Sequence, residues 1–123
     1  MAYYNCIQAA RLKNFLLQIY HCKKDFELLV INKRPKTRMG VYIVPKRRIL
    51  IYSGWAPFPL EEIAIHEYAH HIHETEIRRS CRERAHGSEF QRIYTALCYK
   101  ATATGLFPFI PREALLKYYP HLL

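Results

Sequence analysis

The sequence predicts one α+β domain spanning residues 1–123. Apolar residues recur at helical spacing in three separate segments, and three short runs rich in β-branched and aromatic residues lie between the first two of them. No repeat, low-complexity tract or Gly/Ser linker divides the chain. Half of the residues are apolar, which is enough for one hydrophobic core.

The first helix is expected over residues 4–23. Its buried face follows from four apolar residues at positions i, i+3, i+4 and i+7, a spacing that places them on one side of a helix. These residues are Leu12, Phe15, Leu16 and Ile19.

Three strands are expected next, over residues 26–31, 39–45 and 49–54. The last two are separated by only three basic residues and should form a hairpin. Pro45 has no backbone N–H to donate to a neighbouring strand, so the first strand of this hairpin is expected at an edge of the sheet.

The second helix is expected over residues 59–77. Pro59 suits its first turn, where a backbone N–H would have no helical partner, and Glu61 and Glu62 follow at the positive end of the helix dipole. A second apolar stripe should face the core. It consists of Ile65, Tyr68, Ala69 and Ile72.

Residues 78–87 lack periodicity and are expected to form a loop before the third helix. Ser88 and Gln91 have the spacing of a capping box at the start of that helix, and Gly105 is its expected end. Its buried stripe is Phe90, Ile93, Tyr94 and Leu97. A short terminal helix is expected after Pro111.

The chain carries a net charge of +9, which favours a polyanionic partner such as DNA. No apolar run has the length of a membrane span, and the first residues lack a secretory signal pattern. The scattered cysteines form no CxxC pair, which is typical of reduced thiols in a cytoplasmic protein. They are Cys6, Cys22, Cys81 and Cys98.

Residues 66–70 form the pattern H-E-x-x-H within the second predicted helix. Residues i and i+4 of a helix lie one above the other, so His66 and His70 can together hold one zinc ion. Glu67 lies about 100° further round the helix, beside the metal rather than on it. There its carboxylate can accept a proton from water attached to the metal.

A catalytic zinc site needs a third protein ligand and one position left for water. His71 points about 100° away from the second histidine, and His73 would stack three ligands along one straight helix. The metzincin pattern fails, because Glu76 stands where its last histidine belongs. His86, after the loop, and Glu89, at the start of the next helix, remain, and His86 is preferred.

The segments HEYAH and AHGSEF together resemble the SprT-like zinc metalloprotease family, which includes Spartan. That family pairs H-E-x-x-H with a downstream H-G-x-E-F motif, whose histidine is the third ligand. The resemblance covers residues 5–105 and implies that His66, His70 and His86 bind Zn²⁺ and that Glu67 is the catalytic base. It also implies a zincin-like minimal metalloprotease domain: a leading helix, a small three-stranded sheet, the active-site helix and the third-ligand helix. The paired cysteines of the C-terminal zinc ribbon found in many members are missing here.

The expected function is therefore that of a zinc-dependent endopeptidase. A protein or peptide substrate would lie extended along the predicted edge strand, from Val41 to Pro45. The family's link to DNA-bound proteins implies DNA-associated substrates. Two alternatives remain: a regulatory protease that cuts one specific partner, and a metal-bound nucleic-acid-binding module without catalysis. The residues do not indicate an oligomeric state.

Other polar side chains have looser assignments. Tyr68, Tyr94 and Tyr99 are candidates for a second donor to the oxyanion, although packing explains each of them better. Glu62 and Glu74 lie one turn from the ligand histidines and could orient them. His71 and His73 are expected to be solvated. Four arginines between the ligands could recruit DNA: Arg78, Arg79, Arg82 and Arg84.

Overall fold

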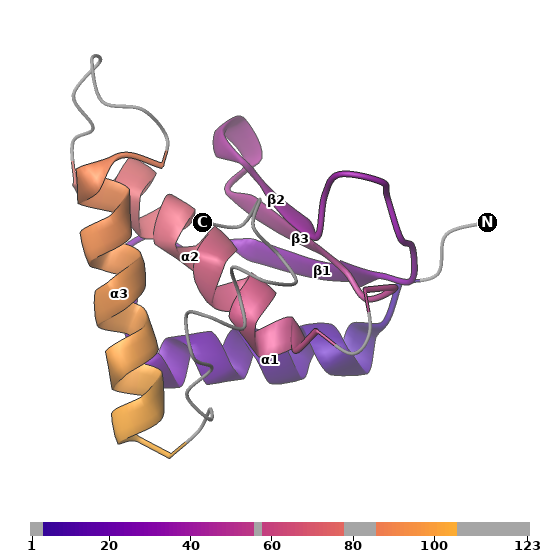
Figure 1. The fold of residues 1–123 in the computed structure, drawn as a ribbon, viewed down its shortest axis with the longest axis horizontal. Helices are drawn as coiled ribbons and strands as arrows, with labels where there is room; N and C mark the ends of the chain where they lie inside the picture. Colours follow the sequence, from indigo (N-terminus) through magenta and orange to yellow (C-terminus); the bar gives the residue numbers. More distant parts are fainter. Residues whose placement is uncertain (1–3, 56–57, 78–85, 106–123) are drawn as a thin grey trace.

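The computed structural model describes residues 4–55, 58–77 and 86–105. The α+β class and the expected order of elements, one helix, three strands and two helices, are confirmed (Figure 1). The short helix expected after Pro111 and nearly all of the loop expected over 78–87 lie outside the described residues. The elements are α1 (Cys6–Ile19), β1 (Glu27–Ile31), β2 (Gly40–Ile43), the 3₁₀ helix η1 (Val44–Lys46), β3 (Arg48–Tyr52), α2 (Leu60–Thr75) and α3 (Ser88–Ala103).

The three strands form one mixed sheet in the order β1-β3-β2. Strand β3 pairs in parallel with β1 and antiparallel with β2, so the predicted hairpin and the predicted edge position of β2 are both confirmed. However, β2 ends at Ile43 rather than at Pro45, because the chain turns into η1 with the proline in its first turn. Arg47 then takes a left-handed conformation, with φ of 47°, before β3 begins.

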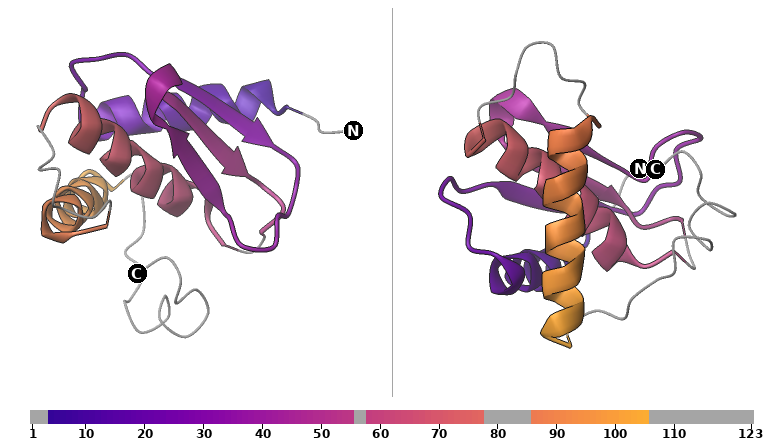
Figure 2. Two further views of the ribbon diagram at one scale, coloured as in Figure 1. Left: turned by 90° about the horizontal axis from the view of Figure 1, so that it is seen from above. Right: turned by 60° about the vertical axis from the view of Figure 1, so that its left-hand side comes forward.

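Helices α1 and α2 cover one face of the sheet, and α3 stands across the ends of both helices (Figures 1 and 2). Burial alternates along β3, where Ile49 and Ile51 are completely buried on the helix-covered face. The stripes predicted for the first two helices are buried in full, and that of the third is buried except for the half-buried Ile93. Helical periodicity therefore identified the core correctly.

Two helix ends differ from expectation. Helix α1 is shorter than predicted, since Asn5 caps it by accepting a hydrogen bond from the backbone N–H of Gln8, and Tyr20 is already extended. The capping box predicted for α3 places the N-cap one residue too late: Gly87 is the N-cap, and Ser88 lies inside the first turn. At the other end Gly105 has φ of 72°, a left-handed conformation that favours glycine after a helix.

Strand β2 approaches α2 closely at Gly40. A Cβ atom added there would lie 2.8 Å from Cγ2 of Ile63 and 3.2 Å from Cγ of Glu67. Only a residue without a side chain allows this approach. The absence of a side chain at this position brings the edge strand alongside the second residue of the H-E-x-x-H pattern.

Among the described residues, no helix combines the length and the apolar character needed to cross a membrane.

Candidate metal centre

The structure brings His66, His70 and His86 together, and one ring nitrogen from each lies within 4.8 Å of the other two. His66 and His70 come from successive turns of α2, while His86 lies two residues before α3. The Nε2 atoms of His70 and His86 are 3.0 Å apart. Two nitrogens bound tetrahedrally to one zinc lie roughly 3.3 Å apart, from Zn–N distances of about 2.0–2.1 Å. His70 and His86 are thus already close to the spacing that a zinc ion requires.

Phe90, on the first turn of α3, supports all three rings. Its ring stacks on His70 with centroids 4.3 Å apart, and meets His86 at 5.0 Å and His66 at 5.1 Å. Phe90 is fully buried, so it forms a rigid apolar wall behind the imidazoles. Burial decreases from His66 through His70 to the exposed His86, which leaves the cluster open on one side.

Burial also prepares these rings to bind a cation. Desolvation lowers the pKa of His66 to about 4, with a smaller contribution from the nearby His86, and desolvation lowers the pKa of His86 as well. Both rings therefore stay neutral at pH 7, and a neutral imidazole keeps the lone pair that a metal needs. The Nδ1 atom of His66 is buried without a hydrogen-bond partner among the described residues. Two neutral imidazoles and an unsatisfied buried nitrogen fit a bound metal ion.

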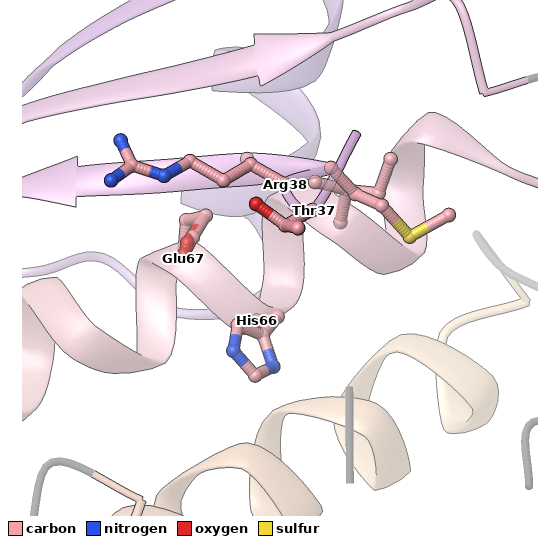
Figure 3. Close-up of a pocket in the computed structure, with 7 residues that line it drawn as sticks. Thr37, Arg38, His66 and Glu67 are labelled. Atoms are coloured by element: carbon pink, nitrogen blue, oxygen red, sulfur yellow. The ribbon is translucent and has the colours of Figure 1, made fainter. Parts of the chain in front are cut away.

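Glu67 lies on the neighbouring face of α2, with only 5% of its surface exposed. Its Oε2 atom has no hydrogen-bond partner among the described residues, and burial raises the pKa of its carboxyl group to about 8. Figure 3 shows Glu67 turned toward Thr37 and Arg38, while His66 points to the other side, where Phe90 and Tyr94 of α3 pack on its ring. A buried, unpaired carboxyl group that lines the same pocket as one of the three converging histidines is typical of a functional site.

The prediction that His71 is solvated is wrong, because this side chain is completely buried. Its Nδ1 atom lies 2.8 Å from the hydroxyl of Tyr42 on β2, and its Nε2 atom lies 2.7 Å from the carbonyl oxygen of Lys24. The ring also packs against Phe26 and Tyr68. His71 thus ties α2 to the edge strand and to the segment before β1, and neither of its nitrogens is left for a metal.

His73 is also buried, with 1% exposure, so its predicted solvation is wrong too. Its Nε2 atom lies 3.2 Å from Oε1 of Glu89 on the first turn of α3. This contact joins Glu89, the remaining alternative to His86 as third ligand, to a histidine that the sequence had set aside as a ligand. It also joins the end of α2 to the start of α3, three residues after His86.

Glu62 does not orient His66 in the way the sequence suggested. Its buried carboxylate accepts a hydrogen bond from the hydroxyl of Tyr94, whose ring packs against His66. The fully buried Tyr68 accepts a hydrogen bond from the backbone N–H of Cys22 and donates one to the carbonyl of Tyr20. Tyr68 and Tyr94 are therefore packing residues, as the sequence favoured.

The remaining candidates are less closely tied to the cluster. Tyr99 is 69% exposed on α3. Glu76 binds the hydroxyl of Tyr20 and the backbone N–H of Lys23, away from the three histidines. Glu74 is half-buried on α2, and its orienting role stays a prediction. The four predicted DNA-binding arginines all lie outside the described residues: Arg78, Arg79, Arg82 and Arg84.

Comparison with protein families, with curated proteins and with solved structures finds no match to this chain. The functional argument therefore rests on the residues themselves and on their arrangement.

Proposed function

We propose that this protein is a zinc-dependent metallopeptidase of zincin-like architecture that hydrolyses internal peptide bonds. The observation that carries the proposal is the convergence of His66, His70 and His86 beside the buried carboxyl group of Glu67. Catalytic zinc sites use three protein ligands, whereas structural sites are closed by four. Within the described part of the chain, no fourth histidine, cysteine or carboxylate joins the cluster.

Zinc, when held by the three histidines, supplies Lewis acidity: it makes water more acidic and polarises a peptide carbonyl group. The chain's own residues set the conditions for that chemistry. The neutral imidazoles of His66 and His86 offer lone pairs, and the Phe90 wall keeps bulk water from one side of the rings. Neutral ligands leave the charge of the ion uncompensated, which favours its action on a carbonyl oxygen.

Glu67 is the proposed general base. Its carboxylate takes a proton from the attacking water and passes it to the nitrogen of the departing amine. In the metal-free chain, burial raises the pKa of this carboxyl group to about 8. The positive charge of a bound zinc ion would lower this pKa and so favour the carboxylate that acts as a base. A purely structural metal module has no use for a buried, unpaired carboxyl group, whose desolvation destabilises the fold. This argument favours catalysis over the silent nucleic-acid-binding alternative.

The substrate would lie extended along β2. The sheet order leaves this strand with a second edge that no other described strand covers, and the Gly40 approach places that strand beside Glu67. An extended peptide can add to such an edge through main-chain hydrogen bonds. The strand thus offers a way to align a peptide bond with the three histidines.

DNA-associated proteins are the proposed substrates. The net charge of +9 supports this choice, since a basic surface attracts nucleic acid. The proposed location is the cytoplasm, which the free thiols of Cys6, Cys22 and Cys98 support.

Replacing Glu67 with glutamine tests the proposal. The zinc-loaded wild type is expected to cut an unfolded protein substrate, and Glu67→Gln is expected to lose about 10²–10⁴-fold in rate. Both proteins should hold one zinc per chain, because glutamine keeps the size of the side chain and leaves the ligands unchanged. Rates come from fragment analysis by mass spectrometry, and metal content from elemental analysis.

Glu61→Gln is the matched control, because Glu61 lies on the same helix and binds Arg11 at the surface. Its activity should equal that of the wild type. Equal activity in Glu67→Gln and the wild type would remove Glu67 from the reaction. Activity that survives complete removal of the metal would refute the metallopeptidase assignment itself.

A further inference from the structure

A pocket of about 130 Å³ lies between the β1–β2 connection and α2, directly beside Glu67 (Figure 3). A water molecule occupies about 30 Å³ in the liquid, so this space corresponds to one side chain of medium size. The pocket is next to the proposed base and to the start of the proposed substrate-binding strand. Its lining residues are Thr37, Arg38, Met39, Gly40, Ile63, His66 and Glu67.

The β1–β2 connection is held in place by contacts behind the pocket. The indole N–H of Trp55 donates to the carbonyl of Arg38 over 2.7 Å, and the backbone N–H of Gly54 donates to the carbonyl of Lys33 over 3.0 Å. The guanidinium group of Arg34 lies 4.7 Å from the centre of the Trp55 ring. The β1–β2 connection is therefore anchored near both of its ends by the segment that follows β3.

The pocket has an apolar floor and a polar, basic rim. Met39 and Ile63 are almost completely buried beneath it, while Thr37 and Arg38 are exposed. The guanidinium group of Arg38 forms no ion pair with any carboxylate of the described residues. The connection over residues 32–39 contains no acidic residue, and its basic residues are Lys33, Arg34, Lys36 and Arg38.

We propose that this pocket is a substrate subsite that selects an aspartate or glutamate side chain, with Arg38 and Thr37 as the recognising groups. The inference rests on the proposed peptidase function and adds a substrate class to it. The methylene groups of a glutamate would contact Met39 and Ile63, and its carboxylate would reach the guanidinium and hydroxyl groups at the rim. Such charge-assisted hydrogen bonds to arginine are stronger than neutral ones.

The turn after the other end of β2 is positively charged, like the pocket rim. Lys46 and Arg47 are exposed in the turn that follows the strand. A peptide extended along β2 therefore meets positive charge at both ends of the strand. An acidic peptide complements this arrangement better than a basic one.

A basic side chain in the pocket is disfavoured. Glu67 is the only acidic residue among the described residues of the lining, and in the proposed reaction its carboxylate serves the attacking water. A lysine or arginine placed there would meet the positive guanidinium group of Arg38 at the rim. Like charges in contact weaken binding.

The test uses an equimolar library of peptides of random sequence and three zinc-loaded proteins: wild type, Arg38→Glu and Lys36→Glu. Mass spectrometry identifies the cleaved bonds. At one position next to the cut bond, the wild type should prefer aspartate or glutamate over glutamine by about tenfold in kcat/KM. Arg38→Glu should lose this preference and turn toward lysine and arginine. Lys36→Glu makes the same charge change on the same connection, outside the pocket lining, and should keep the wild-type preference.

The experiment distinguishes a failure of the proposed subsite from a failure of the proposed peptidase function. Cleavage without an acidic preference, or an equal loss in both variants, would overturn the subsite and leave the peptidase intact. If no zinc-loaded protein cuts any peptide, the proposed function fails and the subsite fails with it. Zinc content and thermal midpoint should be the same in all three proteins, since both substituted residues are exposed.

Discussion

Two pairs of histidines on α2 have opposite surroundings. His66 and His70 converge on His86, and the buried Nδ1 of His66 has no partner among the described residues. His71 and His73 are more deeply buried, and each binds a protein group: His71 contacts Tyr42 and Lys24, and His73 contacts Glu89.

This contrast separates a metal-binding role from a structural one within a single helix. His71 has protein partners on both ring nitrogens, so it holds elements together and cannot bind a metal without losing a hydrogen bond. His73 has a partner on Nε2 only, and its buried Nδ1 has none among the described residues, but its ring is not part of the three-histidine cluster. His66 and His70 differ from both because their rings lie next to each other and to His86, where they can share one ion. Residue type and helical phase alone do not make this distinction, because the partners come from other elements.

The sharpest test of the contrast compares His70→Ala with its neighbour His71→Ala. His70→Ala should lower zinc affinity well beyond the roughly 100-fold that results from losing an outer partner of a metal ligand. His71→Ala should keep one zinc per folded chain, because no metal ligand is removed. Competition with a chelator of known affinity measures both. Equal loss of zinc in the two variants would show that His70 and His71 do not differ in metal binding.

The two variants should rank in the opposite order when unfolding free energy is measured in place of zinc affinity: His71→Ala should lose more stability than His70→Ala. His71→Ala leaves a cavity and deprives the Tyr42 hydroxyl and the Lys24 carbonyl of their partner, so the metal-free protein should lose about 3 kcal/mol of unfolding free energy. His70→Ala should cost less, because its ring is only half-buried. Urea denaturation without metal measures the two values. A smaller loss in His71→Ala than in His70→Ala would argue against its structural role.

The stability of the metal-free protein should depend on pH through Glu67. Its pKa is raised from 4.5 to about 8, so between these values the folded state keeps a proton that the unfolded state has released. This contribution is complete below pH 4.5 and is lost as the pH rises toward 8, by at most about 1.4 kcal/mol per pH unit.

Subtracting the pH profile of the unfolding free energy of Glu67→Gln from that of the wild type isolates the contribution of Glu67. The pKa of His66, lowered to about 4, acts in the opposite direction, with stability lost as the pH falls from 6.5, but it is common to both proteins and cancels. Denaturation at intervals from pH 4.5 to 8 gives the difference. A difference that is flat, or that grows with pH, would show that Glu67 is not desolvated.

The smallest expected effect concerns the contact between His73 and Glu89. Glu89→Gln should weaken zinc binding by about tenfold, the lower end of the range for outer partners, because the start of α3 positions His86. Glu61→Gln, a surface carboxylate on α2, is the matched control and should bind zinc like the wild type. If both variants bind zinc equally, the contact does not position His86. A complete loss of zinc in Glu89→Gln would instead make Glu89 a ligand.

Much of the fold could be predicted because it depends on local periodicity. The three buried stripes, the hairpin and the edge position of β2 all follow from spacing or from the missing N–H of Pro45. The meeting of His66 and His70 follows from the helical repeat, and a loop long enough to return made His86 the better third partner. These features require no knowledge of what lies across the core.

The sequence by itself therefore determined the elements, their buried faces and the three histidines that come together. Only the tertiary structure decided that His71 and His73 are buried, that Glu62 binds Tyr94, and that Gly40 brings β2 against Glu67. The physical reason is that a side chain's environment depends on its partners. The residues that pair with His71, His73 and Glu62 are 16 to 47 positions away along the chain, a separation that no helical or strand period can encode.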